Sequence, residues 1–128
     1  MVKKPQLIPL GLIKPTEPYI PQDCWDEITT HYNGTPASLT PKHKPVIVYR
    51  VDRYYLIDEG NKRAAYLSMQ GHAHVPAIIQ DHEPGEEEDL KVLADKVEKA
   101  GVKSLDDLAH RVYPREIYEK LMDTYQRE

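Results

Sequence analysis

The fold is decided by residues 46–65, which read VIVYRVDRYYLIDEGNKRAA. Two runs of β-branched and aromatic residues, 46–49 and 54–57, are separated by a short segment that contains Asp52 and Arg53. Such runs are typical of strands, and a short polar segment between two of them is typical of a turn. The stretch therefore predicts a β-hairpin.

A helix and a third strand follow this hairpin. Helix-forming residues run from about 61 to 70, and Gly71 suits the left-handed position that ends many helices. The β-branched run at 75–79 predicts another strand. The order strand, strand, helix, strand predicts an α+β fold, in which helices pack on a small mixed β-sheet.

Before the hairpin, prolines dominate the first third of the chain, where they fix φ and remove N–H donors. Residues 7–13 predict one short edge strand, which is a position in a sheet where proline is tolerated. Asp23 is expected to cap a helix that runs to about Tyr32. The Asn-Gly pair at 33–34 is expected to end this helix in a turn.

The chain changes character at Pro84. Residues 1–83 carry balanced charge, whereas residues 84–128 are acidic and show helical spacing of apolar residues. We therefore expect a domain of residues 1–83 and an α-helical C-terminal extension of residues 84–128. The apolar stripes of the extension would pack on the core or on a second copy, so a homodimer through these helices stays open.

Glycine, serine and proline residues indicate where the helices of the extension begin and end. Gly101 is expected to stop a first helix. Ser104 begins a sequence that resembles a capping box, and it predicts a short helix through Leu108 and Val112. Pro114 suits the first position of a last helix.

Composition limits the classes of function. The chain is 40% hydrophobic and 30% charged, with a net charge of −4. Proteins that bind nucleic acid by neutralising phosphates usually carry a basic excess, so duplex DNA is a poor default partner, although a local basic patch stays open. No apolar run approaches the roughly 20 residues of a membrane span, and no signal-type segment follows Met1. We expect a cytoplasmic protein without a membrane partner.

Cys24 is the one cysteine. It cannot form a disulfide within the chain. A lone cysteine is usually a small buried hydrophobe, and this is the interpretation that we favour over a reactive thiol.

The junction at residues 58–63, DEGNKR, suits an anion. A strand that ends at a glycine before a helix presents backbone N–H groups and the positive end of the helix dipole. Lys62 and Arg63 add two cations in the first helical turn, and Gly60 allows a phosphate to approach closely. The alternative is an ordinary tight turn followed by a solvated helix start.

Several short motifs, in the right order, resemble the N-terminal domain of ParB proteins and its sulfiredoxin-like relatives. They are KPVIV at 44–48, YLID at 55–58, EGNKRAA at 59–65, Gly71, VPA at 75–77 and the upstream LIKP at 12–15. The likeness covers roughly residues 7–81. It implies a ParB/sulfiredoxin-like fold whose phosphate motif lies at residues 60–63.

The form of this motif separates branches of the family. The GNKR of residues 60–63 is similar to the GNHR form of free-serine kinases and other stand-alone members, with Lys62 in place of the histidine. Partition proteins read GERR there and bind a cytidine nucleotide. Sulfiredoxins read GCHR, and their cysteine is the nucleophile. Asn61 stands at that place here, so the resemblance does not extend to sulfiredoxin activity.

The resemblance implies that the chain binds a nucleotide (ATP, ADP or CTP) with Mg²⁺. Phosphoryl transfer to a small-molecule acceptor, or nucleotide hydrolysis, would follow. The backbone amides of Gly60 and Asn61 would hold the phosphates, and Lys62 and Arg63 would neutralise their charge. Glu17, placed after the first strand like a functional acid in the kinase-like branch, would be the catalytic base or would hold the metal.

Asp58 and Glu59 flank the motif, and either could serve as a catalytic or metal-binding acid. Catalysis itself stays open. One alternative is a non-catalytic module that senses a nucleotide or binds a partner protein, and another is a DNA-associated, nuclease-like protein.

Two histidines at alternating positions, His72 and His74, together with Asp81 and His82 downstream, are candidate metal ligands. They show no pattern of four ligands, so no metal site of their own is expected.

Overall fold

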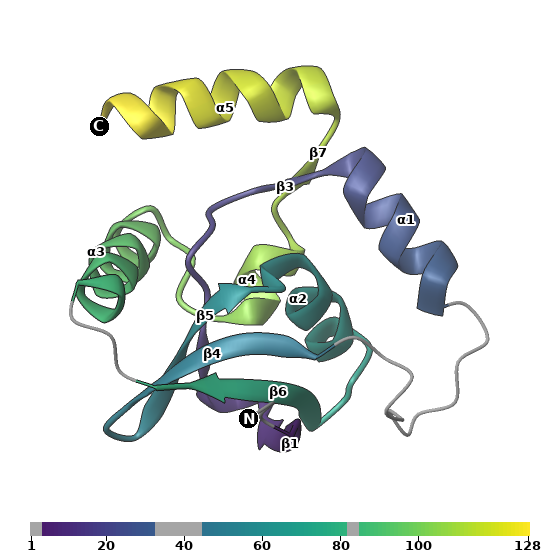
Figure 1. The fold of residues 1–128 in the computed structure, drawn as a ribbon. Helices are drawn as coiled ribbons and strands as arrows, with labels where there is room; N and C mark the ends of the chain where they lie inside the picture. Colours follow the sequence, from purple (N-terminus) through teal and green to yellow (C-terminus); the bar gives the residue numbers. More distant parts are fainter. Residues whose placement is uncertain (1–3, 33–44, 82–84) are drawn as a thin grey trace.

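A computed structural model of the chain describes residues 4–32, 45–81 and 85–128. It is an α+β structure with a mixed five-stranded sheet, which confirms the fold class at that level (Figure 1). The strands lie in the order β1-β6-β4-β5-β2, with bounds β1 Gln6–Pro9, β2 Ile13–Lys14, β4 Val46–Val51, β5 Tyr54–Glu59 and β6 His74–Gln80. A two-stranded sheet pairs β3 Ile20–Pro21 with β7 Val112–Tyr113. The helices are η1 Leu10–Leu12 (3-10), α1 Gln22–Tyr32, α2 Asn61–Met69, α3 Glu86–Lys99, α4 Leu105–Ala109 and α5 Arg115–Arg127.

The predicted hairpin is confirmed as the antiparallel pair β4–β5. Val51 pairs with Tyr54, so Asp52 and Arg53 form the turn. Asp52 adopts a positive φ of 49°, a conformation that aspartate tolerates better than most residues with a side chain. The predicted helix and third strand are confirmed as α2 and β6, and Gly71 has the expected positive φ of 88° after α2.

Helices cover both faces of the sheet. Because successive side chains of a strand point to opposite faces, alternate residues of β4 and β5 pack on α2 from one face and on α3 from the other. The buried residues on the α2 face include Val46, Val48, Ile57, Ala64 and Leu67. Those on the α3 face are Tyr49, Val51, Leu56, Leu90 and Ala94.

The prediction of one edge strand at residues 7–13 is wrong, because this stretch supplies both edges of the sheet. β1 pairs antiparallel with β6 at one edge, and β2 pairs parallel with β5 at the other. Only the three residues of η1 lie between them, and so short a segment reaches no more than about 14 Å. A flat sheet of five strands would hold its edges about 19 Å apart. The sheet must therefore curl until its edges approach.

Burial explains why the strand breaks. In one continuous strand, Ile8 and Leu10 would point to one face and Ile13 to the other. The 3-10 turn shifts this alternation, and all three side chains enter the core, each with 3% of its surface exposed. The N–H of Leu10 donates to the carbonyl of Ala73 at 2.9 Å, so the turn is also held to the end of the α2–β6 connection.

The C-terminal elements share a core with the elements before residue 84. Residues from both parts form one buried cluster of Ile20, Ala65, Val97, Val102, Leu108, Ala109 and Tyr125. β3 and β7 pair in parallel, and the N–H of Ile20 donates to the carbonyl of Arg111 at 3.0 Å. Packing is therefore continuous across residue 84, and α2 is enclosed between the sheet and α4.

The predicted helix through Val112 is wrong at its end. Ser104 caps α4 as expected, since its Oγ accepts from the N–H of Asp107 at 3.2 Å. The helix ends at Ala109, and Val112 lies in β7, where it pairs with Ile20. Pairing between strands 92 residues apart in the chain overrides the local helical pattern.

The first helix, α1, begins at Gln22, one residue before the expected cap. Asp23 lies in the first turn, where its Oδ1 accepts from the N–H of Cys24 at 3.0 Å. The turn predicted at residues 33–34 lies outside the described residues. Among the helices of the described ranges, none is long and apolar enough to cross a membrane.

We expect Leu108→Ala to destabilise the whole protein by about 2–5 kcal/mol, because it removes a fully buried side chain from a tightly packed cluster. Trp25 packs against this cluster and against the main core. The midpoints of urea unfolding measured by circular dichroism and by Trp25 fluorescence should therefore fall by the same amount in this variant. Val92→Ala, on an exposed face of α3, is the matched control. If the midpoint fell by circular dichroism but not by fluorescence, the two parts of the chain would not share one core.

Candidate functional site

Gly60 forms the junction between β5 and α2. Its backbone is left-handed, with φ of 106° and ψ of 20°, a conformation that residues with a side chain adopt reluctantly. A Cβ at this position would also lie 2.5 Å from Cγ1 of Val46, well inside van der Waals contact. The fold therefore needs glycine here, whether or not a phosphate binds.

Asn61 is buried and holds the loop that follows β2. Its Oδ1 accepts from the N–H of Thr16 at 2.8 Å, and its Nδ2 donates to Oγ1 of Thr16 at 3.0 Å. The Thr16 hydroxyl donates in turn to the carbonyl of Ile57 at 2.8 Å. The side chain of Asn61 is thus committed to the loop. A ligand above α2 would use the backbone of this residue, as the sequence predicted.

The same loop places Glu17 beside the first turn of α2. Oε2 of Glu17 lies 4.0 Å from Nζ of Lys62, which is ion-pair range but longer than a hydrogen bond. This oxygen is buried, and it has no hydrogen-bond partner among the described residues. The side chain as a whole is 43% exposed, so only one oxygen of the carboxylate is shielded from solvent.

Arg63 lies against the glycine turn. Its Nη2 donates to the carbonyl of Pro45 at 3.4 Å, and the same atom would be 3.1 Å from a Cβ on Gly60. The guanidinium is therefore half-buried at the start of β4 and close to the first turn of α2.

These groups line one open pocket of about 310 Å³. Its lining residues are Glu17, Cys24, Glu27, Ile28, Gly60, Asn61, Lys62 and Arg63. The volume is at the lower end of the range of small-molecule sites, roughly 300–1,000 Å³. The structure thus brings together five of the seven residues to which the sequence assigned a role.

Asp58 and Glu59 are not among the residues that line this pocket. Both are exposed at the end of β5. Partial burial raises the pKa of the Asp58 carboxyl, and the nearby carboxylates of Glu59 and Glu86 raise it further. Glu86, at the start of α3, accepts a hydrogen bond from the hydroxyl of Tyr49. This acidic group therefore belongs to the contact between the sheet and α3.

The wall supplied by α1 was not predicted. Cys24, Glu27 and Ile28 line the pocket, and their spacing of three and four residues places them on one helical face. Cys24 is half-buried in this wall, which corrects the expectation of a core residue. The helical spacing was visible in the sequence, but nothing in it showed that this face lies opposite residues 60–63.

Two contacts hold this wall in place. Trp25 and Tyr66 pack edge to face, with ring centroids 5.5 Å apart, and join α1 to α2. Arg115 of α5 binds both carboxylate oxygens of Asp23, through Nη2 at 2.9 and 3.0 Å, and Nη2 also donates to Sγ of Cys24 at 3.6 Å. The last helix of the chain thus fixes the first turn of α1, at the rim of the pocket.

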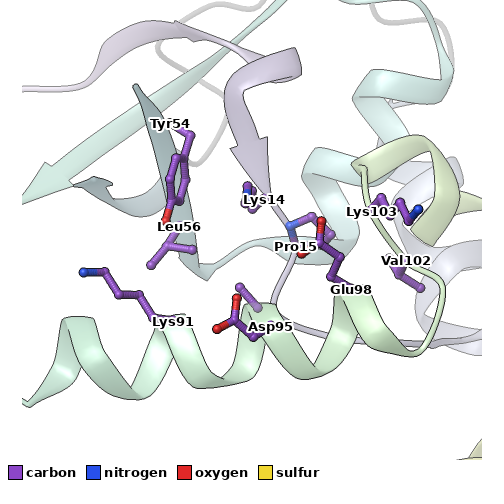
Figure 2. A pocket seen from close by; sticks show the side chains of 10 residues that line it. Lys14, Pro15, Tyr54, Leu56, Lys91, Asp95, Glu98, Val102 and Lys103 are labelled. Carbon is purple, nitrogen blue, oxygen red and sulfur yellow. The ribbon is translucent and has the colours of Figure 1, made fainter. Parts of the chain in front are cut away.

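A second hollow lies between α3 and the sheet edge (Figure 2). It is lined by Lys14, Pro15, Tyr54, Leu56, Lys91, Ala94, Asp95, Glu98, Val102 and Lys103. Lys14 lies over the ring of Tyr54, with Nζ 4.5 Å from the centroid. The hollow measures about 20 Å³, which is room for a single water molecule.

His72, His74 and Asp81, the candidate metal ligands of the sequence, lie within the described residues. Within residues 4–32, 45–81 and 85–128, no group of three or more His, Cys, Asp or Glu side chains could hold a metal ion. His82 lies outside these ranges.

We expect Gly60→Ala to destabilise the protein in the absence of any ligand, because of its positive φ and its contact with Val46. Combining it with Val46→Ala removes the colliding methyl group. In urea unfolding, the double variant should lose less free energy of unfolding than the sum of the losses in the two single variants, by about 0.5–3 kcal/mol. Simple additivity would show that the contact with Val46 does not matter. Gly11→Ala, where an added Cβ meets nothing, is the control.

Asp58→Asn should stabilise the protein at pH 7 by roughly 0.2–1 kcal/mol, a small gain because the group is largely exposed. The fold raises the pKa of Asp58, so its ionisation opposes folding. The stability contributed by the protonated form is complete below the ordinary pKa of 3.8 and is lost as the pH rises through the folded pKa. The variant's advantage should therefore vanish in urea titrations near pH 3. An advantage that persists there would exclude this carboxylate as its source.

No protein-family model matches the chain, and no curated protein matches it significantly in sequence. The resemblance to ParB/sulfiredoxin-like proteins, and the ligands that it implies, stay predictions.

Proposed function

We propose that the pocket above the first turn of α2 binds the phosphates of a nucleotide together with Mg²⁺, and that the chain catalyses phosphoryl transfer or nucleotide hydrolysis. One observation carries the proposal. The uncapped start of α2, its cations Lys62 and Arg63, and the carboxylate of Glu17 all line the same pocket.

The start of α2 supports phosphate binding. Gly60 offers no side chain to cap the helix, and the first N–H groups of any helix have no partner within it. The positive end of the helix dipole adds to the charges of Lys62 and Arg63. Charge-assisted hydrogen bonds from such donors to phosphate oxygens are among the strongest in proteins.

The carboxylate of Glu17 supports the binding of Mg²⁺ in the proposed site. Its buried Oε2 lacks a hydrogen-bond donor among the described residues, since Nζ of Lys62 is 4.0 Å away, and a metal ion in direct contact would give this oxygen a partner. Mg²⁺ is usually held by one or two carboxylates together with substrate phosphates, so this single acid fits such a site. When bound, Mg²⁺ would neutralise phosphate charge that Lys62 and Arg63 leave unbalanced.

The chemistry proposed for this chain is a proton transfer at Glu17. Its carboxylate would accept the proton of an acceptor hydroxyl, from a small molecule or from water, as the oxygen attacks the terminal phosphorus. The bond from that phosphorus to its bridging oxygen would break, and the nucleotide would leave with one phosphate fewer. Lys62 and Arg63 would stabilise the charge on the transferred group. Asn61 would act through Thr16, because their hydrogen bonds hold the loop that carries Glu17.

A binding module without turnover is the second candidate. It is favoured by the position of Asp58 and Glu59, which do not line the pocket, and by the pairing of Glu17 with Lys62. A carboxylate that mainly neutralises a lysine has no role in turnover.

We expect Mg²⁺-nucleotide to raise the melting temperature of the wild type, since a ligand at 100 times its Kd adds about 2.7 kcal/mol of stability. ATP, ADP, CTP and GTP serve as probes. Lys62→Ala should raise the Kd of the tightest-binding nucleotide about tenfold or more, because it removes a charge-assisted contact. Lys99→Ala, on α3 and outside the pocket, is the matched control. No response to any nucleotide would overturn the proposal.

Glu17→Gln separates the two candidates. If Glu17 is the base, phosphate release should fall much more than nucleotide affinity. If it only pairs with Lys62, the variant frees that lysine and nucleotide affinity should rise, with no turnover in the wild type to lose. Calorimetry and a phosphate-release assay on the same preparations distinguish the outcomes.

A further inference from the structure

The lining of the pocket is divided by charge. Both cations, Lys62 and Arg63, come from α2. Both acids come from other elements, Glu17 from the loop after β2 and Glu27 from α1. A ligand that carries only negative charge would meet the Glu17 carboxylate beside Lys62 and the Glu27 carboxylate on the part of the pocket that α1 supplies. The pocket therefore suits a molecule with an anionic end and a second part that donates hydrogen bonds.

Glu27 is the acid available to that second part. Glu17 already pairs with Lys62 at 4.0 Å. Glu27 makes no hydrogen bond or ion pair with the residues that the structure describes, and it is exposed on the wall of the pocket next to Ile28. An ionised carboxylate has two oxygens that accept hydrogen bonds and none that donates. A ligand in this pocket is therefore expected to place hydrogen-bond donors next to Glu27.

We infer that Glu27 binds the ribose hydroxyls of the nucleotide and makes the pocket selective for a ribonucleotide over a deoxyribonucleotide. The inference rests on the proposed function, because it takes the phosphates to lie at α2. In a nucleotide, the ribose adjoins the phosphates, and its two neighbouring hydroxyls match the two oxygens of one carboxylate. An acidic residue plays the same part toward a ribose hydroxyl in dinucleotide-binding folds.

The wall that carries Glu27 is preorganised. The Trp25–Tyr66 contact joins α1 to α2 on one side, and Arg115 holds Asp23 on the other. Ile28 provides an apolar surface beside the carboxylate, on which the carbon face of a sugar can lie. Loss of one hydroxyl would remove one hydrogen bond to a charged group, which is stronger than a hydrogen bond between neutral groups.

The test uses probes without a base, because the base is not identified. Calorimetry on the full chain compares ribose 5-phosphate, 2-deoxyribose 5-phosphate, inorganic phosphate and 2-aminoethyl phosphate. The wild type should bind ribose 5-phosphate about tenfold to a hundredfold more tightly than its deoxy analogue, the range expected for a hydrogen bond to a charged group. Glu27→Ala should reduce this ratio to about threefold or less. It should leave inorganic phosphate bound as tightly or more tightly, because a repulsive charge is gone.

Glu88→Gln, which removes an exposed acid on α3 outside the pocket, is the control and should keep the wild-type ratio. Equal binding of the two sugar phosphates by the wild type would overturn the inference and leave the phosphate site standing. Tighter binding of 2-aminoethyl phosphate would overturn it as well, since Glu27 would then recognise an ammonium group. Loss of binding for every probe, inorganic phosphate included, would overturn the proposed function and this inference with it.

Discussion

The hydrogen bonds between Asn61 and Thr16 are the interaction on which the rest of the site depends. Both side chains are buried. The Asn61 side chain accepts from the backbone N–H of Thr16 and donates to its hydroxyl, which in turn donates to the carbonyl of Ile57. A buried polar group without its partner costs about 1–3 kcal/mol, so these groups leave the loop little freedom. The loop therefore follows α2, and Glu17, the next residue in the chain, faces the first turn of that helix.

The packing of α2 makes this arrangement rigid. One side of the helix meets the sheet through Ala64 and Leu67, and Ala65 joins the cluster of the C-terminal elements. Small side chains allow the close approach of neighbours on both sides. This packing holds the backbone groups at the start of α2 in place, and these are the groups that the proposed site would use.

The sequence predicted those features that depend on neighbouring residues. Two runs of β-branched and aromatic residues in 46–57 indicated the hairpin, and Gly71 marked the end of α2 because its conformation is local. The split of residues 7–13 between two sheet edges and the pairing of Val112 with Ile20 were missed, since each depends on partners far along the chain. The pocket wall on α1 was missed for the same reason. Its face was visible from spacing, but the helix that it meets was not.

Gly60 shows how far a phosphate motif can be interpreted from sequence. Its glycine is expected if a phosphate approaches the backbone, but the left-handed φ and the contact with Val46 demand glycine without any ligand. The glycine therefore cannot discriminate between a binding site and a tight turn. The charged groups carry more information, because the buried Oε2 of Glu17 lies in ion-pair range of Lys62 but has no hydrogen-bond partner among the described residues. Glu17 and Lys62 are the residues that suggest a ligand site, and Gly60 sets only the geometry in which they meet.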